Sequence, residues 1–400
     1  MKLPAADWQK RPGMDALLEA LDAGGGSTRY VGGCVRDTLL ELPVSDVDLA
    51  TRLKPEDVIE RLRKVRIKSV PTGIAHGTVT AVVAGKPVEV TTLRRDVSTD
   101  GRRATVAYTD DWAQDAARRD FTINALSADP STHEVHDYHG GKADLEARLV
   151  RFIGNPLTRI AEDHLRILRF FRFHARFGRG EPDPAALEAC TARANDLMAL
   201  SRERIADELL KLLALPDPVA TVRLMIERRI LRPVLPEIDS ADRLARLAER
   251  EMQLGVAPEP LRRLAALLPR DAALADAVGS RLRLSNAARK RLREAADPAN
   301  GAWSARRLYG ATGLSRTEVA DRFLLSDLDD ARAAAELASL EGWERPRFPL
   351  KGGALIAMGL PPGPEVARTM QRLMQDWADA DFPDEEWVKA RAREAVQGGP

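Results

Sequence analysis

RYVGGCVRDTLLELPVSDVD, residues 29–48, is the stretch that decides the fold of this 400-residue chain. A short β-prone run leads into Gly32 and Gly33, and a helical segment follows over residues 34–42. Glycines let the backbone approach a phosphate closely, and a helix N-terminus offers unpaired N–H groups to an anion. Arg36, one turn into the helix, can reach the same phosphates with both arms of its guanidinium. The pattern therefore predicts a phosphate-binding turn, although two glycines before a helix also occur in plain tight turns.

Two carboxylates follow directly, at Asp46 and Asp48. Residues i and i+2 of a strand point to the same face, so the two acids repel each other unless a cation lies between them. Mg²⁺ is typically held by one or two carboxylates together with substrate phosphates. We therefore predict that Asp46 and Asp48 are catalytic metal ligands for Mg²⁺. The alternative is a solvated strand edge, which the apolar neighbours Val44, Val47 and Leu49 disfavour.

Glu89 is the third candidate catalytic carboxylate. It stands at the start of a Val- and Thr-rich run, residues 87–93, which forms a predicted hairpin with residues 78–84. The alternative is an exposed strand glutamate. Residues 94–111 are polar and lack periodicity, and we expect a mobile loop there. From residue 145 onward the pattern predicts helices without strands.

The segment from Arg118 to Leu126 has a chemistry of its own. Arg119 supplies a positive fork suited to a triphosphate, and Asp120 is an acceptor suited to a ribose hydroxyl. The alternatives are a surface basic pair at residues 118 and 119 and a capping role for Asn124.

A helix predicted over residues 160–177 has one acid at the head of an arginine series. Spacings of three, three, three and four place these side chains on one helical face. The alternative is a solvated basic stripe. The members of the series are Asp163, Arg166, Arg169, Arg172 and Arg176.

Asp163 and Arg166 have the right chemistry to select a base. Cytosine and adenine each present an amino donor beside a ring-nitrogen acceptor, whereas uracil and guanine present the reverse order. A carboxylate beside a guanidinium would therefore pair with C and A and leave U and G with unpaired groups.

These motifs together resemble the family of class II tRNA nucleotidyltransferases and bacterial poly(A) polymerases. The resemblance spans residues 28–215, and Pro71–Thr80 resembles the segment typical of the tRNA enzymes. It implies an α+β fold: a polymerase-β-like nucleotidyltransferase head with a mixed sheet (1–142), followed by an all-α neck (143–215) and a helical, tRNA-binding body and tail (216–400). It also implies that a set of residues binds the nucleotide, namely Gly32, Gly33, Arg36, Arg119, Asp120, Asn124, Asp163, Arg166, Arg169 and Arg172.

The function that the resemblance implies is addition of C, C and A to the 3′ end of tRNA from CTP and ATP, by two-metal transfer with release of pyrophosphate. The loop over residues 94–111 would help the switch from CTP to ATP. Poly(A) polymerase activity and partial addition of only CC or only A remain open. An alternative of another class is a non-catalytic RNA-binding protein, which loss of either carboxylate would favour, yet both are present.

Composition and charge bear on the binding partner, the compartment and membrane attachment. The net charge is +1, but residues 142–179 hold nine Lys or Arg against four Asp or Glu, and such local clustering suits a polyanion. Two cysteines cannot form a disulfide framework, and no apolar run predicts a signal peptide or membrane span. We expect a cytoplasmic protein without membrane attachment, as a monomer or homodimer.

Overall fold

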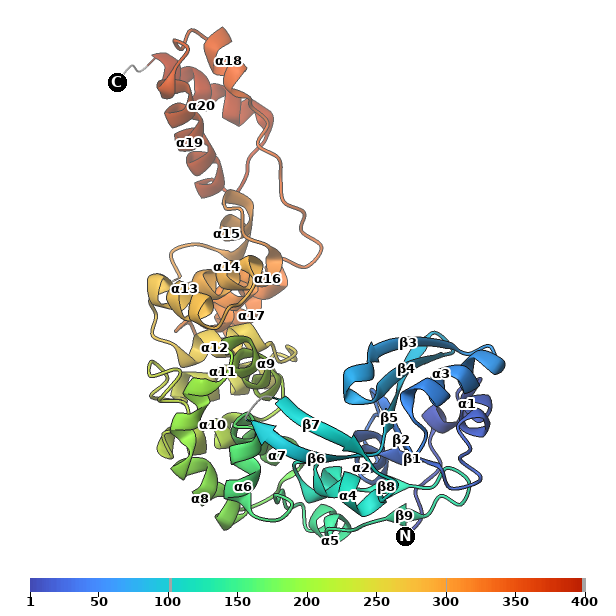
Figure 1. Ribbon diagram of the computed structural model, residues 1–400. Coiled ribbons are helices and arrows are strands. Elements are labelled where there is room, and N and C mark those ends of the chain that lie inside the picture. The colour runs from blue at the N-terminus through green and yellow to red at the C-terminus, as the bar shows by residue number, and fades with distance from the viewer. Residues whose placement is uncertain (101–102, 300, 398–400) are drawn as a thin grey trace. The chain divides into compact units, whose positions relative to one another are not determined.

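The chain forms two compact units in the computed structural model, which describes residues 1–100, 103–299 and 301–397 (Figure 1). Unit 1 consists of Met1–Leu212 and Leu224–Val234. Unit 2 consists of Leu213–Arg223 and Leu235–Pro400. Each unit has its own core and is described by itself.

Unit 1 contains a mixed seven-stranded sheet in the order β3-β4-β5-β2-β1-β8-β9. β2 and β5 run parallel, and the other neighbouring strands run antiparallel. The predicted α+β class with a mixed sheet is therefore confirmed. The strands are β1 Thr28–Val31, β2 Val47–Thr51, β3 Lys68–Gly73, β4 Thr78–Val83, β5 Lys86–Thr92, β8 Ser127–Ala128 and β9 Val135–His136.

Helices α1 (Met14–Ala20) and α3 (Pro55–Lys64) lie together beside β3, β4 and β5 (Figure 1). Their apolar side chains are buried, with Leu17 and Leu62 fully covered. In β4 the buried side chains alternate with partly exposed ones, because successive residues of a strand face opposite sides of the sheet. The predicted hairpin of β4 and β5 is confirmed.

The prediction of a loop over residues 94–111 is wrong. β6 (Arg94–Asp100) and β7 (Arg103–Tyr108) form a two-stranded antiparallel ribbon, with a register shift between Asp96 and Ser98. Polar composition hid these strands, because ladder hydrogen bonds join backbone groups and do not require apolar side chains. Residues 101 and 102 of the predicted mobile tip lie outside the described residues.

Helices make up the rest of unit 1. Four phenylalanines tie α7 to the segment after α4, with ring centroids of Phe121 and Phe173 5.1 Å apart and those of Phe152 and Phe170 5.8 Å apart. This aromatic core positions the arginines of α7 against residues 119–124. The helices are α2 Gly33–Leu39, α4 Trp112–Ala117, α5 Gly141–Glu146, α6 Pro156–Glu162, α7 Arg166–Phe177, α8 Pro184–Ala192, α9 Arg202–Leu213 and α10 Val219–Glu227.

The single helix predicted over residues 160–177 is also wrong. α6 ends at Glu162, Asp163 is extended with φ −153° and ψ 106°, and α7 begins at Arg166. The Asp163 carboxylate accepts a hydrogen bond from the backbone N–H of Leu165 at 3.1 Å. Asp competes for backbone groups in this way, so it favours a break over a helix interior.

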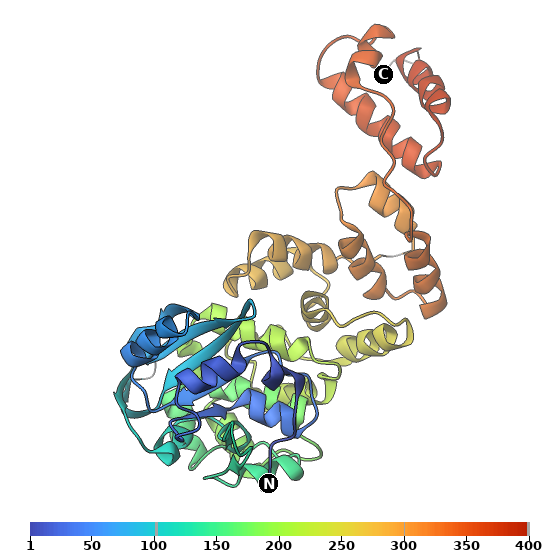
Figure 2. The same ribbon diagram turned by 90° about the vertical axis from the view of Figure 1, so that its right-hand side faces the viewer.

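All the named elements among the described residues of unit 2 are helices, as predicted. In Figure 2 the helices beyond residue 350, drawn in red, pack side by side around Leu355, Leu373 and Val388. No helix among the described residues has both the length and the apolar character that crossing a membrane requires. The helices are α11 Asp242–Gln253, α12 Pro260–Leu267, α13 Ala272–Arg281, α14 Asn286–Ala295, α15 Ala305–Ala311, α16 Arg316–Leu324, α17 Asp330–Ser339, α18 Gly352–Ala357, α19 Pro364–Asp379 and α20 Glu385–Gln397.

Candidate active site

The glycine turn connects β1 to α2. Gly32 has φ +70° and ψ −125°, and a Cβ placed there would lie 2.8 Å from Nη1 of Arg119. The backbone conformation therefore favours glycine, and any side chain at this position would displace the Arg119 guanidinium. Arg36 is buried one turn later, where it contacts Asp37 at 2.7 Å and donates to the side-chain oxygen of Asn124.

Three carboxylates meet at the next strands. Asp48 of β2 is paired in register with Glu89 of β5, and Asp46 lies immediately before β2. Burial raises the pKa of Asp48 to about 6, with further contributions from the charges of Glu89 and Asp46, while Arg119 opposes the shift. Negative charge is thus crowded at this point, and a cation bound there would relieve it.

Residues 119–124 lie across a cavity from the glycine turn and Asp48, and form one of its walls. Arg119 donates to the carbonyl of Asn124 at 3.4 Å and pairs with Asp115 at 3.4 Å. The backbone of residues 118 and 119 is in turn held by the buried guanidinium of Arg159, which donates to both carbonyls. Both the guanidinium and the backbone of Arg119 are therefore held in place.

Asp120 is the centre of a buried network. Oδ2 accepts from Arg169 at 2.8 and 2.6 Å, and Oδ1 accepts from Asn124 and the N–H of Phe121 at 2.8 Å each. Burial opposes ionisation of Asp120, but the Arg169 charge and these hydrogen bonds outweigh it and lower the pKa. Both oxygens are engaged within the protein, so Asp120 here orients Arg169 and Asn124. Its predicted contact to a ribose hydroxyl stays a prediction.

The two predicted base readers are each held by other side chains. Oδ2 of Asp163 accepts from Arg204 of α9 at 2.8 Å. Nη1 of Arg166 donates to Glu162 at 2.5 Å and to the carbonyl of Arg159 at 2.8 Å. These bonds fix the geometry of the pair before any base arrives.

The two arginines nearer the end of α7, Arg172 and Arg176, contact carboxylates away from the Asp163 and Arg166 pair. Arg172 pairs with the buried Glu208 of α9 at 2.6 Å, and Arg176 lies 3.5 Å from Asp37. Glu208 also lies 3.6 Å from Arg169. Arg172 thus supports the wall through Glu208 rather than facing the cavity.

A cavity of about 450 Å³, which we call the head pocket, brings most of the predicted residues together. Asp46, Glu89 and Arg172 of the predicted set are not among its lining residues, and Phe173 is a lining residue that the sequence did not predict. Reasoning from sequence also missed Arg159, Arg204 and Glu208, since their partners are distant in the chain. The lining residues are Gly32, Gly33, Arg36, Asp48, Arg119, Asp120, Asn124, Asp163, Arg166, Arg169 and Phe173.

Two family models match this chain. Residues 28–151 match the poly A polymerase head domain, and residues 181–242 match the probable RNA and SrmB-binding site of polymerase A. The head match covers the glycine turn, the three carboxylates and Arg119. It therefore includes both walls of the head pocket except the part contributed by α6 and α7.

Proteins that are similar to this chain over nearly its whole length have names that agree with one another. The mitochondrial CCA tRNA nucleotidyltransferase 1 of Danio rerio is 33% identical over 383 residues, which are 92% of this chain and 88% of that protein. The CCA-adding enzyme of Lacticaseibacillus paracasei is 30% identical over 385 residues, 92% of each chain. The structure of the Bacillus stearothermophilus CCA-adding enzyme in complex with CTP matches with a TM-score of 0.74 at 26% identity, and covers 97% of this chain and 99% of its own.

Proposed function

This chain belongs to the family of CCA tRNA nucleotidyltransferases, or CCA-adding enzymes, and from that premise we propose that it adds C, C and A to the 3′ end of tRNA from CTP and ATP. One observation carries the proposal. Asp48 and the pair Asp163 and Arg166 line the same cavity, so a nucleotide held by its base would have its phosphates within reach of the acids.

We propose Mg²⁺ as the metal, held by Asp46 and Asp48 with Glu89 adjacent. Among the described residues no group of three or more His, Cys, Asp and Glu is arranged to hold a metal ion alone. The proposed site instead has two carboxylate ligands, and Mg²⁺ is usually bound by one or two carboxylates together with substrate phosphates. The pKa of Asp48 is raised mainly by burial and further by the charges of Glu89 and Asp46, and a cation bound beside these acids would offset their repulsion. Bound there, Mg²⁺ would supply positive charge to the triphosphate.

The reaction is attack of the tRNA 3′ oxygen on the α-phosphorus of CTP or ATP. A bond forms between these two atoms, the bond to the bridging oxygen breaks with release of pyrophosphate, and the proton of the 3′ hydroxyl passes to solvent. Arg36 and Arg119 line the pocket as fixed guanidinium groups and would bind the phosphate oxygens. Such groups stabilise the transition state because they need not reorganise as charge develops.

Base selection would be made by Asp163 and Arg166. The carboxylate accepts from the amino group of cytosine or adenine, and the guanidinium donates to the neighbouring ring nitrogen. Uracil and guanine would leave both side chains with unpaired polar groups in a half-buried site, which is costly. Because Arg204 and Glu162 already hold the two readers, little ordering is required when the base binds.

The assay that tests this proposal uses tRNA that lacks its last three nucleotides. We expect CTP alone to add two residues, CTP with ATP to add three, and UTP or GTP to add none. ATP alone should extend only a tRNA that already ends in CC. Product lengths on a denaturing gel give the answer, and failure of the CTP and ATP mixture to add three residues would refute CCA addition.

The same gel separates the alternatives. A poly(A) polymerase would build a long ladder from ATP alone, a CC-adding enzyme would stop after two residues, and an A-adding enzyme would require a CC end. A non-catalytic RNA-binding protein would bind tRNA and extend nothing. The segment around His76, which resembles the tRNA enzymes, favours CCA addition over a poly(A) polymerase.

The division into head (1–142), neck (143–215) and tRNA-binding body and tail (216–400) is also a proposal. It is supported by the position of the named strands, all of which end by residue 136. A cytoplasmic location is proposed on the two cysteines, which are free, buried thiols suited to a reducing compartment. The state of a monomer or homodimer stays a prediction.

A further inference from the structure

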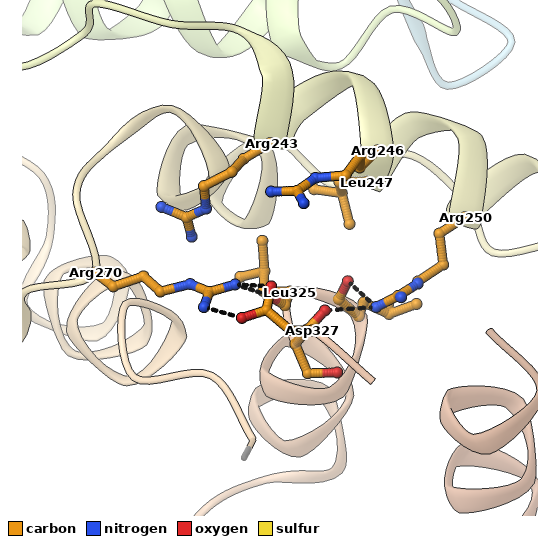
Figure 3. A pocket seen from close by; sticks show the side chains of 9 residues that line it. Arg243, Arg246, Leu247, Arg250, Arg270, Leu325 and Asp327 are labelled. Atoms are coloured by element: carbon orange, nitrogen blue, oxygen red, sulfur yellow. Dashed lines mark hydrogen bonds and ion pairs between the residues drawn. The ribbon is translucent and has the colours of Figure 1, made fainter. Parts of the chain in front are cut away.

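Unit 2 contains a second cavity, of about 370 Å³, in a part of the chain where sequence motifs assigned nothing. We call it the arginine pocket. Figure 3 shows the guanidinium groups of Arg243 and Arg246, both from α11, on one side of the cavity, across from Arg270 and Asp327. The lining residues are Arg243, Arg246, Leu247, Arg250, Arg270, Leu324, Leu325, Ser326 and Asp327.

Two of the four arginines that line the pocket form ion pairs within the protein. Arg250 pairs with Asp330 at 2.6 Å and donates to the carbonyls of Leu324 and Ser326, at 3.0 Å each. Arg270 pairs with Asp327, at 2.6 Å between Nη2 and Oδ1. Each of these guanidinium charges is therefore balanced by one carboxylate.

The other two arginines form no ion pair among the described residues, and Asp327, the one carboxylate that lines the cavity near them, is already paired with Arg270. Arg243 donates to the carbonyl of Leu268, which is uncharged, and its buried Nη2 has no hydrogen-bond partner. Arg246 is exposed and makes no hydrogen bond or ion pair among the described residues. Burial lowers the pKa of Arg243, the nearby charges of Arg270 and Arg246 lower it further, and the charge of Asp327 opposes the shift only in part. An anion in the cavity would relieve this repulsion and satisfy the free N–H groups.

We propose that the arginine pocket binds a phosphodiester group of the RNA substrate. Guanidinium groups match phosphate oxygens with paired hydrogen bonds, and phosphate contacts position an RNA without reading its sequence. The aliphatic walls of Leu247, Leu324 and Leu325 offer no aromatic face for a stacked base, which favours a backbone phosphate over a free nucleotide. The identity of the RNA as tRNA rests on the proposed function.

The test compares Arg246→Ala and Arg246→Glu with the unchanged protein. Arg246 makes no hydrogen bond or ion pair with any residue that the structure describes, so both variants should fold, which thermal unfolding will check. We expect the affinity for tRNA, measured by fluorescence anisotropy, to fall about fivefold to tenfold in Arg246→Ala and further in Arg246→Glu. The slope of log affinity against log salt should decrease by about 0.7 to 0.9. In the addition assay the change should appear in KM for tRNA rather than in KM for CTP.

Arg63→Ala is the matched control, because Arg63 is an exposed arginine of α3 in unit 1 and its loss removes the same charge. If Arg246→Ala and Arg246→Glu bind tRNA no more weakly than Arg63→Ala, the proposal is wrong even though CCA addition stands. If inorganic phosphate binds the unchanged protein and not Arg246→Glu, yet tRNA affinity is unaffected, the pocket holds a free anion and the RNA assignment is overturned. If the unchanged protein does not extend tRNA at all, the proposed function is refuted instead.

Discussion

The head pocket and the arginine pocket are both rich in arginine, but they differ in how those charges are balanced. In the head pocket, Arg36, Arg119, Arg166 and Arg169 each pair with a carboxylate of the protein. In the arginine pocket, Arg243 and Arg246 pair with no carboxylate in the part of the chain that the structure describes. Pairing holds the head-pocket arginines in place for a nucleotide, which would bring its own metal ion, whereas arginines without an ion pair leave positive charge available to a phosphodiester. The same residue type thus serves different purposes according to what its neighbours already bind.

The largest effect is expected at Asp46 and Asp48, the proposed metal ligands, whereas the carboxylate that lines the arginine pocket, Asp327, is paired with Arg270. Asp46→Ala and Asp48→Ala should each lower nucleotide incorporation by about a thousandfold or more, because triphosphate charge would lose its cation. Affinity for tRNA should remain close to that of the unchanged protein. Glu89→Gln tests whether the third acid contributes. Asp57→Ala, at an exposed position of α3, is the control, and incorporation that survived both alanine variants would contradict the assignment.

A smaller effect is expected at the base readers. Arg166→Ala should reduce the preference for CTP over UTP by about tenfold to a hundredfold, the size of one lost paired contact. Arg204→Ala should reduce it less, because Asp163 keeps its bond to the N–H of Leu165. The ratio of kcat/KM for CTP and UTP measures both. Lys211→Ala, on the same helix as Arg204, should leave the ratio unchanged, and an equal ratio in all three variants would rule out this reading of the pair.

The smallest effect concerns stability. Asp48 has a folded pKa of about 6, above its ordinary value of 3.8, so the folded state binds the proton more tightly and loses stability as pH rises from about 4 through about 6. Asp48→Asn should therefore raise the free energy of unfolding at pH 7.5 by about 1 to 2 kcal/mol and leave it unchanged near pH 3. Mg²⁺ should raise the Tm of the unchanged protein at pH 7.5 but not that of the variant. Thermal unfolding with and without Mg²⁺ provides the comparison, and a variant less stable at pH 7.5 would contradict the expected sign.

Short sequence motifs were sufficient to predict those residues of the head pocket that lie close together in the sequence. The glycines, Arg36 and Asp48 occur within seventeen residues of one another, and their strand and helix follow from turn chemistry. The ribbon of β6 and β7 was missed because its pairing is made by the backbone. The break at Asp163 was missed because its arginine spacing fits a continuous helix. The arginine pocket could not be predicted at all, since α11, Arg270 and Asp327 are separated by long stretches without a motif.

The sequence by itself determined which chemical groups this protein could use: two acids separated by one residue, a glycine turn, and an acid–arginine pair suited to C and A. These depend on residue type and short spacing, which the chain carries without folding. Only the tertiary structure decided that Glu89 lies in register with Asp48, that Arg204 and Glu208 hold Asp163 and Arg169, and that Arg246 forms no ion pair within residues 1–100, 103–299 and 301–397. Such facts depend on which distant segments meet, because charges become paired or unpaired only when packing brings them together.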